Sequence, residues 1–213
     1  ASDVYKRQQE KLDAIKAWWA RYGTLMVSLL TAVVVAWGGW WGWKAYQSHR
    51  ANQAMGYFEA LEDAARLGGA DSSVRIKAAA ATLRDQYGST GYAARGALVA
   101  AQALQAQKDL DGARQQLEWL AGQAKNPAMQ AVARLRLAGL LLDQKQYDGA
   151  LAQLNNAPAA FAALFADRRG DILAAQGKRD EARAAWQSAI DGLGTANPLT
   201  QVVQLKLDAL SGA

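Results

Sequence analysis

The stretch Gln144-Lys145-Gln146-Tyr147-Asp148-Gly149-Ala150 decides the fold, because two related stretches occur elsewhere in the chain. Residues 107–113 read QKDLDGA and residues 176–182 read QGKRDEA, so all three are polar turns that close on an alanine. Each turn follows one apolar segment and precedes another. This order predicts a unit of two helices joined by a short turn, present three times.

Residues on either side of these turns recur at fixed distances from the closing alanine. A small residue lies twelve positions before it, a leucine nine positions before it and a large apolar residue four positions after it. These positions are Ala101, Ala138 and Gly170; Leu104, Leu141 and Leu173; and Leu117, Leu154 and Trp186. Small residues let paired helices approach closely, and large residues fill the remaining space. The pattern predicts helix–helix contacts at these positions.

The spacing of the turns identifies the kind of repeat. Successive turns are offset by 37 residues (107 to 144) and 32 residues (144 to 176), on either side of the tetratricopeptide period of about 34 residues. The repeats are degenerate, and an alanine-rich helical bundle without true repeats is the alternative. We expect Asp111, Asp148 and Asp180 to be the N-caps of the second helices. A last helix, capped by Asn197 and begun by Pro198, is expected to cover the end of the stack.

Composition favours an all-α fold and argues against several functions. Hydrophobic residues make up 51% of the chain, and only three prolines occur. The net charge of +5 is spread without a cluster of basic and aromatic residues, so no nucleic-acid partner is expected. One histidine and no cysteine argue against a metal site or a catalytic triad. We therefore expect no cofactor, no small-molecule substrate and no enzyme activity.

An uncharged run, YGTLMVSLLTAVVVAWGGWWGW, extends from Tyr22 to Trp43 on the N-terminal side of the repeats. About 20 residues at ~1.5 Å rise cross the ~30 Å hydrocarbon core as a helix. Six of the eight tryptophans flank this run, as expected at the two lipid–water interfaces: Trp18, Trp19, Trp37, Trp40, Trp41 and Trp43. A cleaved signal peptide is the alternative, but its apolar region is shorter and ends at small residues. We predict an uncleaved transmembrane helix over residues 22–46.

Basic residues beside the run predict its orientation. Two follow it closely, Lys44 and Arg50, whereas five precede it: Lys6, Arg7, Lys11, Lys16 and Arg21. The positive-inside rule then places the N-terminus in the cytoplasm and the C-terminal domain across the membrane. Gly38 and Gly42 lie about one turn apart in the run and predict close packing against another transmembrane helix. The alternative is that glycine is simply common in such helices.

These features divide the chain into four segments. Residues 1–21 are an N-terminal basic helix, residues 22–46 the transmembrane helix, residues 47–90 the membrane-proximal helices, and residues 91–213 the repeats with a C-terminal capping helix. Within the third segment, Gly68-Gly69 is expected to end the helix that leaves the membrane. Asp71-Ser72-Ser73 then supplies an N-cap for a helix that runs to Tyr87. The chain starts at Ala1 rather than at methionine, so we give its first eight residues little weight.

Three stretches carry a resemblance to a known family. They are Ala17-Trp18-Trp19 at the end of the basic helix, WKAYQSHRANQA (residues 43–54) after the single span, and ADRRGDILAAQGKRDEARAAWQSAI (residues 166–190). With them the chain resembles the YfgM family, ancillary subunits of the bacterial Sec translocon with a tetratricopeptide-like soluble domain. The resemblance implies an inner-membrane protein with a periplasmic domain, association with the SecYEG channel and a PpiD-like periplasmic chaperone, and assistance to newly translocated proteins. It implies no catalytic residues.

A stack of helical repeats has a concave surface lined by the first helix of each pair. On the repeat alignment we expect this surface to include Arg95, Leu98, Gln102, Leu135, Leu142, Asp167 and Asp171. An apolar strip with flanking charges suits a peptide or a partner helix, and charge reversal at Asp167 and Asp171 is expected to weaken partner capture. The alternative is that the leucines are ordinary core between repeats. Two other functions remain open, a homo-oligomeric membrane-tethered scaffold and a substrate-holding chaperone.

Overall fold

The computed structural model describes residues 2–123 and 126–211, and within these ranges every regular element is a helix. The all-α prediction is therefore confirmed. The chain divides into two compact units, Ala1–Asn52 and Gln53–Ala213. Helix α1 (Ser2–Leu67) supplies the first unit and the beginning of the second.

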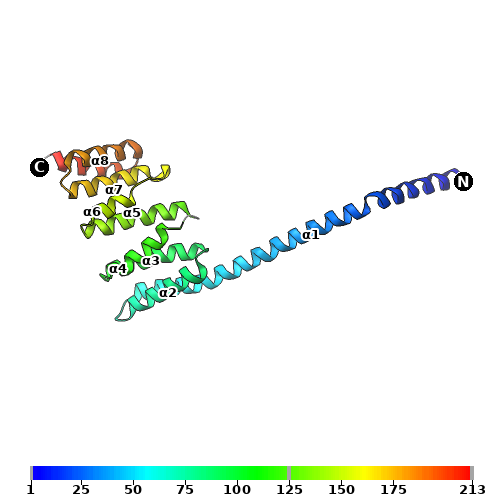
Figure 1. The fold of residues 1–213 in the computed structure, drawn as a ribbon, viewed down its shortest axis with the longest axis horizontal. Coiled ribbons are helices and arrows are strands. Elements are labelled where there is room, and N and C mark those ends of the chain that lie inside the picture. Colours follow the sequence, from blue (N-terminus) through cyan, green and yellow to red (C-terminus); the bar gives the residue numbers. More distant parts are fainter. Residues whose placement is uncertain (1, 124–125, 212–213) are drawn as a thin grey trace. The chain divides into compact units, whose positions relative to one another are not determined.

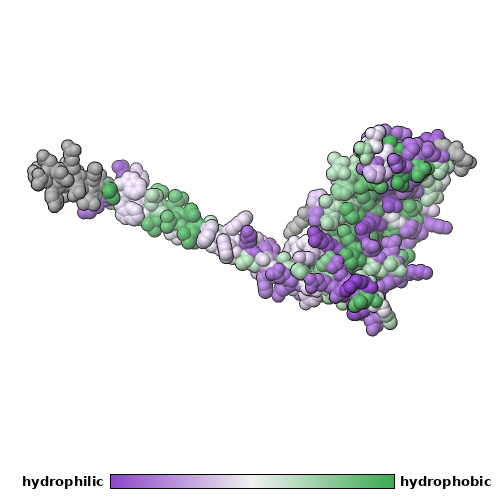
Figure 2. All heavy atoms as spheres, turned by 180° about the vertical axis from the view of Figure 1, so that it is seen from behind, coloured by the Kyte–Doolittle hydropathy of each residue, from purple (hydrophilic) through white to green (hydrophobic). Residues whose placement is uncertain are grey.

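The first unit consists of helix α1 as far as Asn52, and from Ile15 onward its large apolar side chains face outward. Leu30 is 70% exposed and Trp40 69% exposed, values that a soluble core helix would not show. The hydroxyls of Ser28 and Thr31 each donate a 2.8 Å hydrogen bond to the carbonyl four residues earlier, so neither of these two protons needs water. Among the described residues, the helix from Ile15 onward is long and apolar enough to cross a membrane, and Figure 2 shows the hydrophobic band along it.

The second unit is a series of antiparallel helices that follow one another in chain order (Figure 1). After the end of α1 come α2 (Ser72–Tyr87), α3 (Gly91–Ala106), α4 (Leu110–Ala121), α5 (Pro127–Asp143), α6 (Tyr147–Gln153), the short 3-10 helix η1 (Ala159–Phe161), α7 (Ala162–Ala175), α8 (Arg179–Leu193) and α9 (Pro198–Ser211). Helices adjacent in the chain pack together, and α5 also contacts α7. This packing of pairs against pairs is that of an α-solenoid.

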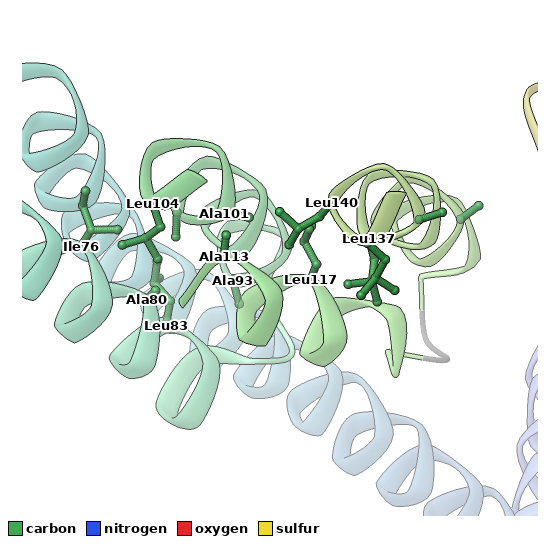
Figure 3. Packing of buried hydrophobic residues seen from close by; sticks show 14 of the residues in the cluster. Ile76, Ala80, Leu83, Ala93, Ala101, Leu104, Ala113, Leu117, Leu137 and Leu140 are labelled. Atoms are coloured by element: carbon green, nitrogen blue, oxygen red, sulfur yellow. The ribbon is translucent and has the colours of Figure 1, made fainter. Parts of the chain in front are cut away.

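The recurring positions of the sequence form the core of this stack. All of the predicted small and large positions, and the alanines that close the three turns, are buried. Figure 3 shows Leu104 near Ala113 and Leu117 next to Leu140, where α3 meets α4 and α4 meets α5. In the last pair the Trp186 indole lies directly over Gly170: a Cβ on Gly170 would come within 2.8 Å of Trp186 Cγ. A tryptophan at the large position thus requires glycine at the small one.

The three turns have the same backbone conformation. Lys108, Lys145 and Gly177 adopt positive φ angles of 63°, 58° and 79°. In the first turn the N–H of the next residue, Asp109, donates to the Leu104 carbonyl at 2.9 Å; the equivalent bonds, Gln146 to Leu141 and Lys178 to Leu173, measure 2.8 and 2.9 Å. This is a Schellman motif, which satisfies carbonyls left open at a helix C-terminus.

The predicted N-caps of the second helices were wrong by two residues. The caps are Asp109, Gln146 and Lys178, because the Schellman turn occupies only three residues and the next helix begins immediately after it. Asp111, Asp148 and Asp180 lie instead inside the first helical turn. A carboxylate there still interacts favourably with the helix dipole, which explains why an aspartate recurs at this position.

The other predicted helix ends agree with the structure, with one exception. Helix α1 ends at Leu67, and Gly68 and Gly69 follow with φ angles of 64° and 97°. The Asn197 side chain accepts a 3.0 Å hydrogen bond from the N–H of Leu199, as expected of an N-cap before Pro198. Asp71 precedes α2 as predicted, but its side chain makes no capping hydrogen bond.

Candidate partner-binding surface

Two adjoining hollows lie along the inner helices of the second unit. The first, of about 800 Å³, lies between the end of α1 and α3. The second, of about 400 Å³, is lined by α3, α4, α5 and α7. Gln102 of α3 borders both hollows, so they form one continuous surface. Apart from α4, the helices that line this surface are the first members of successive pairs, which is the concave side of a helical-repeat stack.

The first hollow has an apolar floor and a charged rim. Its α1 wall presents Glu59, Glu62, Asp63 and Arg66 at three- and four-residue spacing, which places them on one helical face. The facing wall and floor are formed by small apolar residues: Ala65 of α1, and Val99, Ala103 and Ala106 of α3. The hollow is therefore an apolar trough that is acidic along one edge.

The charges in the second hollow are of the opposite sign. Arg136 of α5 and Arg168 of α7 line it, with Asp143 as the only carboxylate among its described lining residues. Arg136 is exposed and has no ion-pair partner among the described side chains. Arg168 lies beside Gly139, where a Cβ would be 3.6 Å from its guanidinium carbon. At that distance a side chain at position 139 would make ordinary van der Waals contact with Arg168.

Of the residues predicted for this surface, two are solvent-accessible polar groups. Arg95 is exposed on α3, and Gln102 lines both hollows. The three predicted leucines, Leu98, Leu135 and Leu142, are partly buried and pack against the core cluster that runs through α1–α7. Their side chains therefore support the walls of the surface, and the apolar floor is provided by Val99 and neighbouring alanines instead.

The two predicted aspartates, Asp167 and Asp171, are bound by the capping helix. Lys206 of α9 donates 2.7 Å hydrogen bonds to a carboxylate oxygen of each. Asp171 also accepts a 3.2 Å bond from the Trp186 indole and lies 3.6 Å from Arg168. Burial lowers the pKa of Lys206, but the two carboxylates outweigh burial and raise that pKa above its ordinary value. These aspartates fasten α9 to α7, whatever else they contact.

The acidic edge and the unpaired Arg136 are not among the residues that the sequence predicts for this surface. Adjacent carboxylates such as Glu62 and Asp63 are, taken alone, typical of a solvated helix face. The signal was present: residues 59, 62, 63 and 66 are all charged and share one helical face. Arg136 had no comparable signal, because its exposure depends on which face of α5 the neighbouring pairs cover.

Metal binding and histidine-dependent catalysis have little support on this surface. In the described part of the chain, no group of three or more His, Cys, Asp or Glu side chains could hold a metal ion. His49, the single histidine, is exposed in the first unit, on α1. The hollows combine helical grooves, apolar floor and charged edges, an arrangement suited to protein segments.

Comparison with known proteins agrees with the fold. The model of the tetratricopeptide repeat-like domain matches residues 16–212. The ancillary SecYEG translocon subunit of Neisseria gonorrhoeae is 31% identical over 208 residues, which cover 97% of this chain and 99% of that protein. The subunit of the same name from Escherichia coli K12 is 28% identical over 213 residues, or 98% of this chain and 99% of that protein. No solved structure matches significantly. The resemblance inferred from the sequence is confirmed, and the chain belongs to the tetratricopeptide repeat-like family that it shares with these relatives.

Proposed function

We propose that this chain is a membrane-anchored adaptor ancillary to the SecYEG translocon in the bacterial inner membrane. One observation carries the proposal: the part of the chain that the structure describes combines one membrane-competent helix with a concave helical-repeat surface, and the chain is similar to ancillary SecYEG translocon subunits over nearly its whole length. A repeat stack of this kind acts through its surface. The role is therefore binding rather than catalysis.

The orientation is part of the proposal. The excess of basic residues before the span, five against two, favours a cytoplasmic N-terminus and a periplasmic repeat domain. On that side of the membrane the domain meets proteins as they leave the channel. We infer that it assists them together with a periplasmic chaperone of the PpiD type.

The concave surface is the proposed docking site. Arg95 and Gln102 are accessible to a partner, whereas Leu98, Leu135 and Leu142 hold the walls in place. Asp167 and Asp171 lie on α7, where they are bound by Lys206. Charge reversal at these aspartates would weaken capture and also loosen α9, so Arg95 and Gln102 are the better positions for a test.

Co-purification tests the association. The tagged full-length chain, extracted from native membranes in a mild detergent, is expected to retain SecYEG subunits and a periplasmic chaperone. Arg95→Trp with Gln102→Trp, which place bulky side chains on the concave surface, should reduce the chaperone yield several-fold, whereas Glu118→Gln on α4, outside both hollows, should not. If neither SecYEG nor a chaperone is retained by the unaltered chain, the adaptor proposal is wrong. A stable homo-oligomer by light scattering would then favour the scaffold, and suppression of aggregation of an unfolded protein would favour the holding chaperone.

Protease protection tests the orientation. In intact spheroplasts, added protease should digest the repeat domain and leave only a fragment that contains the span, and carbonate washing should not release the full-length chain. Protection of the repeat domain would place it in the cytoplasm and contradict the proposal.

A further inference from the structure

The shape and lining of the trough between α1 and α3 indicate which kind of protein segment it binds. It is about 800 Å³ in volume and runs between two helices whose lining residues repeat at three- and four-residue spacing. Its floor consists of Ala65, Val99, Ala103 and Ala106. Because these side chains are small, they leave space for larger apolar side chains from outside. A groove of this kind accepts the apolar face of an amphipathic helix.

The charge on the rim selects among such helices. Asp63 is paired with Arg66 at 2.7 Å, but Glu59 and Glu62 form no ion pair with any residue that the structure describes. Both glutamates are exposed to solvent. Three carboxylates against one guanidinium leave the edge of an apolar trough negative. Lysine or arginine side chains next to the apolar face of a partner helix would meet this edge.

The adjoining hollow limits how far such a helix can extend. Beyond Gln102 the lining changes sign, with Arg136 and Arg168 against Asp143. A basic helix that slid along the concave surface into this second hollow would bring like charges together, which costs binding energy. The change of sign therefore confines the basic part of a partner to the α1–α3 trough.

We propose that the α1–α3 trough binds an amphipathic helix whose apolar face is flanked by lysine or arginine. This inference rests on the proposed adaptor function, and it names the chemistry of the segment that the adaptor captures. The apolar residues of the partner fill the space over Val99 and Ala103, and its basic residues pair with Glu59 and Glu62. The paired charges of the partner and of the two glutamates lie at the solvent-exposed rim of the trough. They therefore contribute more to selectivity than to total affinity.

Fluorescence anisotropy with a pair of designed peptides tests the proposal. One labelled peptide carries leucines at helical spacing flanked by lysines; its partner has glutamate in place of every lysine. The full-length chain is used in nanodiscs of zwitterionic lipid, and empty nanodiscs correct for binding of the peptides to lipid. The lysine peptide is expected to bind roughly ten times more tightly than the glutamate peptide, with the ratio falling as salt is added.

Matched variants of the chain test whether Glu59 and Glu62 cause the preference for the lysine peptide. Glu59→Lys with Glu62→Lys should abolish or reverse the preference for the lysine peptide. Asp85→Lys with Glu118→Lys makes the same change in net charge at exposed positions outside both hollows, and should leave the preference in place. Equal affinity for the two peptides, or a preference that persists in the Glu59/Glu62 variant, would overturn the inference.

The peptide-binding test and the test of the adaptor proposal can fail independently of each other. SecYEG retention is measured on the same protein preparations by co-purification. A chain that retains SecYEG but shows no peptide preference loses only this inference, whereas a chain that shows the preference but retains no SecYEG loses the adaptor function.

Discussion

At the residue scale, each of the three turns within the helix pairs contains a residue in the left-handed backbone conformation. Lys108 and Lys145 adopt the left-handed conformation that Gly177 adopts at the equivalent place. This conformation costs a residue with a Cβ about 1–2 kcal/mol, and glycine nothing. The Schellman hydrogen bonds require it all the same, so two of the three turns carry a conformational cost that the third avoids.

Exchanging residues between these turns should change stability in opposite directions. Lys108→Gly and Lys145→Gly are each expected to raise the free energy of unfolding by about 0.5–1 kcal/mol, because the relief of strain exceeds the added flexibility of the unfolded chain. Gly177→Ala should lower it by about 1 kcal/mol. Urea unfolding of the detergent-solubilised chain, followed by circular dichroism, measures all three. Destabilisation by both lysine replacements would show that the lysine side chains contribute contacts of their own.

Asp109 has two roles, as the N-cap of α4 and as the ion-pair partner of Lys77, and a change of pH should distinguish them. Its carboxylate accepts hydrogen bonds from Lys77 Nζ at 2.8 Å and from the Gly112 N–H at 2.9 Å, and these hold its pKa below the ordinary value of 3.8. Since the unfolded chain takes up the proton first, the resulting stability is present above the ordinary pKa and is lost as the pH falls through the folded pKa.

The variant Asp109→Asn keeps a capping oxygen but removes the charge. It should be less stable than the unaltered chain near neutral pH, and the difference should shrink as the pH falls below about 4. Asp109→Ala removes the cap as well and should be about 1 kcal/mol less stable than Asp109→Asn at every pH. Unfolding midpoints measured across this range test both expectations; a difference between the Asn variant and the unaltered chain that does not depend on pH would contradict the assigned charge effect.

At the element scale, helix α9 is fastened by polar as well as apolar contacts. Val203 and Leu207 are buried against the last pair, and Lys206 binds both Asp167 and Asp171 of α7. Without Lys206 the two carboxylates would remain near each other and partly covered. The attachment of α9 to α7 therefore depends on the positive charge of Lys206.

Replacing Lys206 by methionine should lower the free energy of unfolding by about 1–2 kcal/mol, between the values typical of exposed and buried ion pairs. Adding Asp167→Asn and Asp171→Asn should recover part of the loss, because the repulsion between the carboxylates is then removed. Hydrogen exchange of the α9 amides reports the same effect locally. If the triple variant is no more stable than the single one, the loss came from packing and not from charge.

The membrane helix carries its own prediction. A Cβ at Gly38, Gly39 or Gly42 would meet nothing within 4 Å inside the chain, so a second helix could approach there. If Gly38 and Gly42 form that contact, Gly38→Ile with Gly42→Ile should reduce the retention of SecYEG in detergent several-fold. Position 39 lies about 100° around the helix from Gly38 and about 60° from Gly42, and Gly39→Ile is the control. Equal retention in both variants would remove the glycine pair from consideration.

At the scale of the whole molecule, the sequence predicted the architecture better than the surface. Repeating Ala101, Leu104, Ala113 and Leu117 in three register-matched sets predicted which residues are buried, because small and large residues must alternate where helices touch. The transmembrane helix followed from length and tryptophan placement. Both are local patterns that can be counted along the chain.

The features that the sequence did not predict depend on which faces of the helices pack against one another. For Leu98, Leu135 and Leu142 the sequence left two alternatives open, concave surface or core between repeats, and these side chains pack partly buried against the core cluster. Asp167 and Asp171 meet Lys206 from about 35–39 residues further along the chain. The caps were misplaced because the turn holds an αL lysine, a conformation that residue type does not signal.

Site-specific photocrosslinking in native membranes tests most directly whether the concave surface of this anchored stack captures the proteins around the Sec channel. A photoreactive residue at Gln102, where the two hollows meet, should yield adducts with a SecYEG subunit, a periplasmic chaperone or a protein in transit. The same residue at Glu118 of α4, outside both hollows, should not. Identical adducts from the two positions, or adducts at Gln102 that contain only copies of this chain, would contradict the role proposed for the concave surface.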